Sequence, residues 1–225
     1  MKKIVWTNKI QEIHDTPELH IQPTRNYIPN WYKNIKIYDG YKFINRIRTV
    51  KTCPSFSDIF NEGFVMLSPV DIYIDVKKDH YEWKIPSSYF TIEDHPKEQF
   101  LKYANIPNAK YVLKFISGWN CISPNGYSLR QLPMFYDEQS DFFVPYGVVK
   151  TDFSHEINPQ IIINGKVKEI LIKQGTPLAM YIPYKRKDNL KLSIENYDQH
   201  KRKIKQSSFY TSGSTFRSNY HKYKN

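Results

Sequence analysis

The segment SPNGYSL at residues 123–129 contains polar groups suited to contact with a phosphorylated ligand. The hydroxyl groups of Ser123 and Ser128 and the amide group of Asn125 can hydrogen-bond phosphate oxygens. Backbone N–H groups near Gly126 can form a small concavity that binds anions. Asparagine and glycine are also typical of ordinary turns, where positive φ angles occur without any ligand. The segment therefore predicts either a ligand-binding loop or a structural turn.

The segment GVVKTDF at residues 147–153 adds a cation, a carboxylate and an aromatic ring. Lys150 carries a positive charge that favours an anionic ligand, and Phe153 presents a ring on which a sugar could stack. Asp152 is a further candidate ligand contact. Together with Glu156 it is also a carboxylate that could serve as a general base in a hydrolase. From the residues alone, the two segments predict either a site for an anionic ligand or ordinary turns, and the catalytic residues of any hydrolase remain unknown.

Signatures of metal sites and of nucleophilic catalysis are scarce in the sequence. Its histidines form no His-Glu-x-x-His motif, and Cys53 and Cys121 form no Cys-x-x-Cys pair. His80 and Glu82 would be half of an iron site only if a distant histidine joined them, and their segment KKDHYEW favours a hairpin turn. Cys121 has no base adjacent to it in the sequence. We therefore expect reduced thiols, no metal and no cofactor.

The elements that position these residues are predicted to be short antiparallel strands. Tyrosine (18 residues) and phenylalanine (13 residues) favour strands, and 14 prolines break up helices. Apolar and polar residues alternate over 70–76, and short β-rich runs separated by Gly, Pro and Asn occupy 121–184. The Asn-Gly pair in INGKV (163–167) predicts a hairpin between two strands. A mainly β fold follows, namely an antiparallel β-sandwich or β-roll of jelly-roll type.

Three consecutive parts are expected along the chain. Residues 1–63 form an N-terminal segment with short helices that packs on the core, and one helix begins at Pro54 and ends before Gly63. Residues 64–184 form the β core. Residues 185–225 form a basic C-terminal extension, since the composition changes after the last strand-like run.

The extension Lys185–Asn225 contains 11 Lys and Arg against 3 Asp and Glu, which is +8 of the chain's formal charge of +11. Leu190, Ile194, Tyr197 and Ile204 would lie near one face of a helix. Basic and aromatic residues in alternation suit single-stranded nucleic acid, and they also suit an acidic protein surface. A solvated extension is the third interpretation. No apolar run approaches the roughly 20 residues that cross a bilayer, so no membrane partner is expected.

Distinctive segments follow one another in the order IPNWYKNI, RTVKTCPSFSDIFNEGFVM, DIYIDV, NGYSL, GTPLAMYIPYKR and FRSNYHKYKN. Together they resemble a protein family of tailed marine bacteriophages, especially myoviruses of cyanobacteria, to which no activity is assigned. The resemblance extends over nearly the whole chain, and its most specific pieces are TVKTCPSF and GTPLAMYIP. It implies a viral protein located in the host cytoplasm or in the virion.

Within residues 122–186, the segments SPNGYSL, GVVKTDF and GTPLAMYI stand in this order. They resemble the core of trimeric dUTP pyrophosphatases, where a Pro-Arg-Ser-Gly-Leu phosphate loop precedes a Gly-Val-Ile-Asp-x-Asp-Tyr loop and a Gly-Asp-Arg-Ile-Ala-Gln segment. Lys150 replaces the carboxylate that orients the attacking water in that family. Asn125 replaces its phosphate-gripping arginine, and Met180 replaces its glutamine. Phe153 keeps the aromatic face.

The second resemblance implies a homo-oligomer, a trimer, that binds a nucleotide or another phosphorylated ligand and has impaired hydrolysis. Its implied contacts are the seven residues Ser123, Asn125, Gly126, Ser128, Lys150, Asp152 and Phe153. The alternative is a virion structural or assembly protein that docks through its basic tail.

Overall fold

The computed structural model describes residues 2–39, 47–102, 104, 106–135, 141–187 and 191–211. The chain divides into two compact units. The first, here called the β body, comprises Met1–Lys33 and Phe60–Lys187, and the second comprises Asn34–Ile59 and Asp188–Asn225. The sequence predicted divisions after residues 63 and 184.

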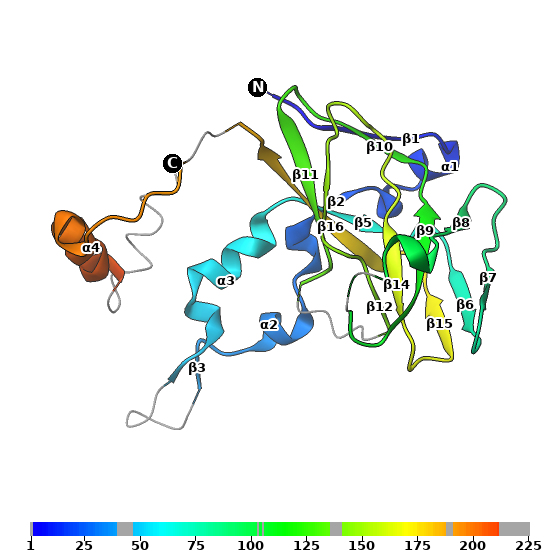
Figure 1. Cartoon of the computed structure of the whole chain (residues 1–225), viewed down its shortest axis with the longest axis horizontal. Coiled ribbons are helices and arrows are strands. Elements are labelled where there is room, and N and C mark those ends of the chain that lie inside the picture. Colours follow the sequence, from blue (N-terminus) through cyan, green and yellow to red (C-terminus); the bar gives the residue numbers. More distant parts are fainter. Residues whose placement is uncertain are drawn as a thin grey trace. The chain divides into compact units, whose positions relative to one another are not determined.

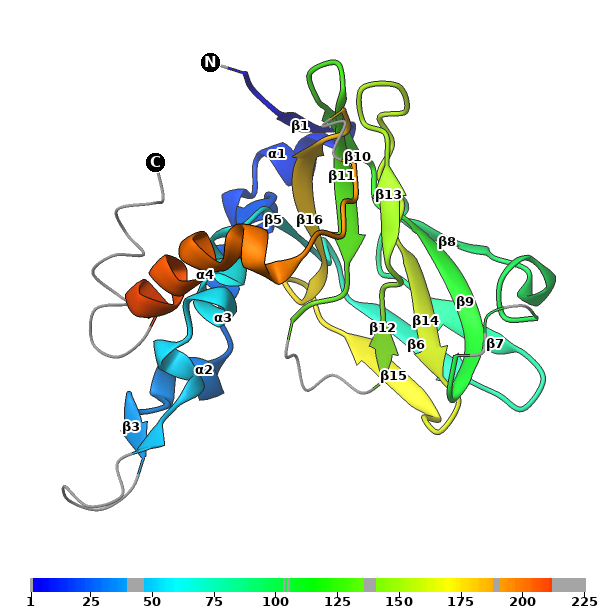
Figure 2. The same cartoon turned by 60° about the vertical axis from the view of Figure 1, so that its left-hand side comes forward.

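The β body consists mainly of antiparallel strands, so the mainly β class is confirmed (Figure 1). One sheet has the order β13-β11-β16-β5-β2, and Figure 2 shows β16, β11 and β13 side by side. Its strands are β13 (Gly147–Val149), β11 (Tyr127–Leu132), β16 (Pro177–Lys185), β5 (Phe64–Leu67) and β2 (Gln22–Pro23). The β11–β13 pair joins the two segments that were predicted to bind a ligand.

The other sheets of the β body are also antiparallel. One has the order β12 (Phe142–Phe143), β14 (Gln160–Asn164), β9 (Ala109–Ile116) and β8 (Thr91–Asp94). Another has the order β15 (Glu169–Ile172), β6 (Ile72–Val76) and β7 (Tyr81–Lys84). The third pairs β1 (Val5–Asn8) with β10 (Trp119–Ile122). The predicted KKDH turn is confirmed, because β6 pairs with β7 and the Lys77 N–H donates to the His80 carbonyl at 3.0 Å.

Helices are short except near the C-terminus. The α-helices are α1 (Gln11–His14), α2 (Asn30–Asn34), α3 (Pro54–Asp58) and α4 (Tyr197–Thr211). Short 3-10 helices span Pro17–Leu19, Thr24–Tyr27, Val50–Thr52, Ile59–Asn61 and Lys97–Gln99, and β3 (Tyr38–Asp39) pairs with β4 (Ile47–Arg48). The helix predicted between Pro54 and Gly63 is confirmed, with proline in its first turn. No described helix has both the length and the apolar composition needed to cross a membrane.

The predicted INGKV hairpin is wrong. β14 pairs with β9 and β12, whereas the next strand, β15, pairs with β6 in a different sheet. The Gly165 N–H donates to the Asn108 carbonyl at 2.7 Å, so the turn is attached to the start of β9. Neither Asn164 nor Gly165 is among the residues with positive φ, which a tight Asn-Gly hairpin turn requires.

One hydrophobic core links the sheets of the β body. It receives side chains from every sheet, for example Cys121, Tyr181, Leu113 and Ile74. Helix α1 contributes as well, since its residue Ile13 is buried in the same cluster. The strands that hold the ligand-binding candidates are therefore anchored by their inward-facing side chains, and the turns between them lie at the surface.

Candidate functional site

The structure brings the two predicted segments into direct contact. We call residues 123–128 and 147–154 the double turn. The Ser123 N–H donates to the Thr151 carbonyl at 3.3 Å, and the Gly126 N–H donates to Asp152 Oδ2 at 2.9 Å. Leu129 lies opposite Val149 in the β11–β13 pair that adjoins both turns. The two segments thus form one surface feature of the β body.

Ser123 and Ser128 of the double turn are buried, and their hydroxyl groups are hydrogen-bonded within the protein. Ser123 Oγ accepts a bond from Thr151 Oγ1 at 2.8 Å and donates to the Tyr127 carbonyl at 3.3 Å. Ser128 is fully buried, and its Oγ accepts a bond from the Arg186 guanidinium group at 2.8 Å. These hydroxyl groups stabilise the turns. They therefore have the role of a structural turn, which was one of the two interpretations of the SPNGYSL segment.

Asp152 forms an ion pair with Arg186 at the end of β16. Arg186 Nη1 donates to Asp152 Oδ1 at 2.7 Å, Arg186 Nη2 donates to Oδ2, and Nη1 also reaches the Tyr127 carbonyl at 2.7 Å. The hydrogen bonds from Arg186 and from the Gly126 N–H hold the pKa of Asp152 well below its usual range. A carboxylate of low pKa with both oxygens bonded is a poor general base, so the turn lacks an effective base at this position.

Three candidate residues face solvent. Asn125 and Lys150 are exposed, and the side chain of Phe153 is 87% exposed. Lys150 and Phe153 belong to one tight turn, because the N–H groups of Phe153 and Ser154 both donate to the Lys150 carbonyl, at 3.0 and 2.9 Å. Gly126 has a φ of +83°, and a Cβ atom added there would meet nothing within 4 Å. The double turn therefore presents a cation, an amide and a bare aromatic ring beside an open loop.

Exposed side chains on β13 and directly before it extend this surface. Tyr146 is 75% exposed and Val148 is 57% exposed. Val148 lies opposite Arg130, which is also exposed and lies over the Tyr184 ring at 4.6 Å from its centroid. Lys150 and Arg130 thus add positive charge to a face with several aromatic rings.

Other residues singled out in the sequence lie apart from this surface. Met180 is fully buried in β16, opposite Leu132 and Val65, so it is not exposed to a ligand. His80 and Glu82 form an exposed pair at 3.5 Å near the β6–β7 turn. Within the described residues, no three His, Cys, Asp or Glu side chains come together as a metal site would require.

Cys121 is buried in β10 and has no free surface for reaction. Burial raises the pKa of its thiol to about 12, so it is protonated at neutral pH. Cys53, in contrast, is exposed. Neither thiol belongs to the double turn.

The sequence did not reveal two contacts of this site, Thr151 within the double turn and Arg186, which bonds to the double turn from the end of β16. Arg186 is 34 positions away from Asp152 and reaches it because Tyr127 in β11 lies opposite Lys185 in β16. This register is set by strand pairing over the whole sheet, and no local pattern encodes it. The ion pair could have been found only from a correct strand order.

Comparison with protein-family models gives no match, and comparison with curated proteins gives none either.

Proposed function

We propose that the chain is a binding protein for a nucleotide or another phosphorylated ligand, which docks on the double turn and is not hydrolysed there. The observation that carries the proposal is the pairing of exposed Lys150 with exposed Phe153 in a turn whose carboxylate, Asp152, is neutralised by Arg186. A free cation and a free ring remain at the surface.

Each exposed group has a matching part in a nucleotide. The Lys150 ammonium group attracts phosphate and donates hydrogen bonds to its oxygens. The Phe153 ring offers an apolar face to a sugar or base, and stacking would remove that face from water. The Gly126 N–H is already bonded to Asp152 Oδ2, so we assign the phosphate to Lys150 rather than to this N–H group.

The absence of hydrolysis in this proposal follows from the same residues. Water attack on a phosphate needs a base with a suitable pKa, and the pKa of Asp152 is lowered by its bonds to Arg186 and Gly126. Lys150 occupies the place that a catalytic carboxylate has in dUTP pyrophosphatases. We accordingly propose a related β-sandwich scaffold with impaired chemistry, encoded by a tailed phage, acting in the host cytoplasm and assembled as a homo-oligomer.

Thermal unfolding with dUMP, dUTP, deoxyuridine and pyrophosphate tests the proposal. A hundredfold excess over Kd is expected to raise Tm by roughly 5 °C. Lys150→Ala should abolish the part of the shift that depends on phosphate, and Phe153→Ala should weaken binding of deoxyuridine and dUMP alike. Lys173→Ala, which removes an exposed lysine elsewhere on the β body, is the matched control. No shift at millimolar ligand, or equal shifts in the Lys150 and Lys173 variants, would end the proposal.

A second function is favoured by the basic extension. Leu192 and Ile194 are 90% and 91% exposed, and they precede the basic helix α4. Apolar residues next to positive charge suit docking to an acidic protein surface, as a virion structural or assembly protein would require. Mass spectrometry of purified phage particles distinguishes the functions, since a virion protein is present there in stoichiometric amounts and a factor confined to the host cytoplasm is not.

A further inference from the structure

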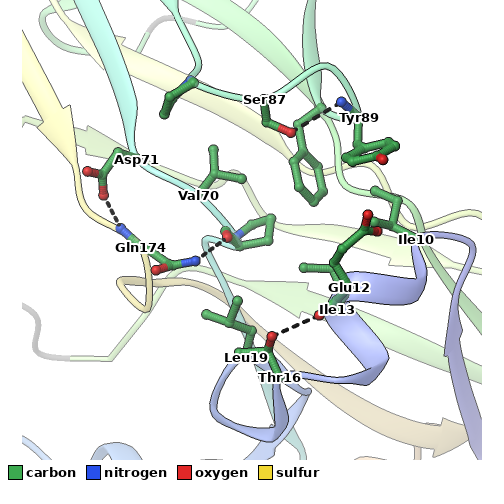
Figure 3. Close-up of a pocket in the computed structure, with 13 residues that line it drawn as sticks. Ile10, Glu12, Ile13, Thr16, Leu19, Val70, Asp71, Ser87, Tyr89 and Gln174 are labelled. Carbon is green, nitrogen blue, oxygen red and sulfur yellow. Dashed lines mark hydrogen bonds between the residues drawn. The ribbon is translucent and has the colours of Figure 1, made fainter.

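A hollow of about 360 Å³ lies in the β body apart from the double turn (Figure 3). Its volume is in the range of small-molecule sites. Apolar side chains form much of its wall, among them Ile10 and Ile13 near α1, Val70 before β6, and Phe90 before β8. Ile13, Val70 and Phe90 are buried members of the core, so this wall is fixed by packing beneath it.

The charged side chains that line the hollow are acidic. Glu12 on α1 and Asp71 before β6 contribute carboxylates, and no Lys, Arg or His is among its described lining residues. The whole chain carries a formal charge of +11. A hollow whose charge is opposite to that of the chain favours positively charged ligands and disfavours phosphates.

Most polar groups around the hollow are already bonded within the protein. The Gln174 N–H donates to Asp71 Oδ1 at 2.7 Å, which holds Asp71 at one side of the hollow. Ser87 Oγ accepts from the Tyr89 N–H at 3.2 Å, and Thr16 Oγ1 donates to the Glu12 carbonyl at 2.8 Å. These bonds engage one oxygen of Asp71 and the hydroxyl groups of Ser87 and Thr16, and they do not involve the Glu12 carboxylate.

Glu12 and Tyr89 lie together on the side of the hollow opposite Asp71 (Figure 3). A hydrogen bond to Glu12 raises the pKa of Tyr89, so the phenol and the carboxylate face each other. The Tyr89 side chain is 57% exposed, and its ring is accessible. A carboxylate next to an accessible aromatic ring attracts ammonium groups, through charge-assisted hydrogen bonds and through the ring's electrons.

We propose that this hollow binds a small organic cation, a primary ammonium group attached to an apolar body. The ammonium group donates to the Glu12 carboxylate beside the Tyr89 ring. The apolar body lies against Ile13, Val70 and Phe90. The site is independent of the double turn and has the opposite preference for charge.

The test uses phenethylamine with two neutral or anionic analogues of similar shape, 2-phenylethanol and phenylacetate, titrated into the full chain labelled with nitrogen-15. The amine is expected to shift the amide resonances of residues 10–16, 69–71 and 87–90 at millimolar concentration. The alcohol should bind more weakly, and the carboxylate should not bind. This test needs no variant. Equal affinity for the amine and the alcohol overturns the proposal, and so does the lack of any shift at these amides.

Glu12→Gln provides the variant test, because it removes the charge of an exposed side chain at constant size. The affinity for phenethylamine should fall about tenfold or more, as expected for the loss of a charge-assisted hydrogen bond. The affinity for 2-phenylethanol should not change. Glu18→Gln, an exposed site outside the hollow, is the matched control. Lys150→Ala should bind the amine normally, so a failure of this site and a failure of the double turn are distinguishable.

Discussion

Asp152 accepts hydrogen bonds from the Arg186 guanidinium group and from the Gly126 N–H. These bonds stabilise the ionised carboxylate and lower its pKa in the folded protein. A group whose folded pKa is depressed contributes stability above its unfolded pKa, which is about 4 for aspartate. That contribution is lost as the pH falls below about 4 toward the folded pKa. The stabilisation that the ion pair gives to the folded protein therefore depends on pH.

Asp152→Asn is expected to unfold at lower urea concentration than the native protein at pH 7, because the guanidinium group loses its charged partner. The difference should shrink as the pH falls below about 4, because Asp152 then takes up a proton in the unfolded chain while it stays ionised in the folded protein, which favours unfolding of the unmutated protein. Urea unfolding at several pH values measures this, with Glu18→Gln as a control for the general effect of removing a negative charge. A difference in stability that does not change with pH would contradict the assigned ion pair.

The two cysteines should differ sharply in reactivity. Cys53 is exposed, whereas Cys121 is buried with its pKa raised to about 12. Only thiolates react quickly with disulfide reagents. One thiol per chain is expected to react with Ellman's reagent at pH 8 in the native protein, and both should react in denaturant. Rapid modification of both thiols without denaturant would show that β10 is not packed as described.

At the scale of elements, β9 is the strand whose packing should matter most for the sheet that contains it. Leu113 is fully buried, with Ile161 of β14 opposite it on one side and Asp94 of β8 on the other. Truncation of a buried leucine removes apolar contacts and leaves a cavity. The neighbouring sheet offers a matched position, since Leu171 in β15 is 54% exposed.

Leu113→Ala should lower the free energy of unfolding by about 2–5 kcal/mol. Leu171→Ala removes the same atoms from an exposed position and should change it by less than about 0.5 kcal/mol. Chemical denaturation of both variants gives the comparison. Similar losses at the two positions would mean that the inner and outer faces of these strands are wrongly assigned.

Local elements were predictable where a short pattern determines them. The alternation over 70–76 predicted β6, and Pro54 predicted the start of α3. The INGKV turn was assigned wrongly because the partner of Gly165 is Asn108, far away in the sequence. The burial of Ser123 and Ser128 was missed for the same reason. Contacts that depend on strand order cannot be predicted from a local sequence pattern.

At the scale of the whole molecule, charge is distributed unevenly along the chain. Residues 185–225 carry +8 of the formal charge of +11, whereas the remaining residues carry +3. The strand pairings of the β body lie between Val5 and Lys185, and Arg186 completes the double turn. The residues after Lys187 are therefore separable in principle from the proposed ligand site, which includes Arg186.

A chain ending at Lys187 should fold cooperatively and keep its affinity for dUMP, because the double turn and its ion pair are retained. The same truncation should abolish any binding to single-stranded DNA that depends on the extension, with the salt dependence typical of phosphate contacts. Circular dichroism melting and fluorescence anisotropy measure the two properties. Loss of dUMP binding in a folded truncated chain would move the proposed site to the extension.

The mainly β class of the fold could be predicted from composition and periodicity, because many short aromatic and β-branched runs favour antiparallel strands. The proximity of the 123–128 and 147–153 segments was also expected. The neutralisation of Asp152 by Arg186 was not expected, since it depends on the strand register of the complete sheet.

The most direct measurement is a titration of the labelled chain with dUTP, followed by amide and phosphorus NMR together. The account predicts saturable shifts at Asn125, Gly126 and residues 150–154, with dUTP remaining intact. Absence of shifts at these amides with millimolar dUTP would contradict binding at the double turn. Release of pyrophosphate that is lost in Asp152→Asn would contradict the proposal that binding occurs without hydrolysis.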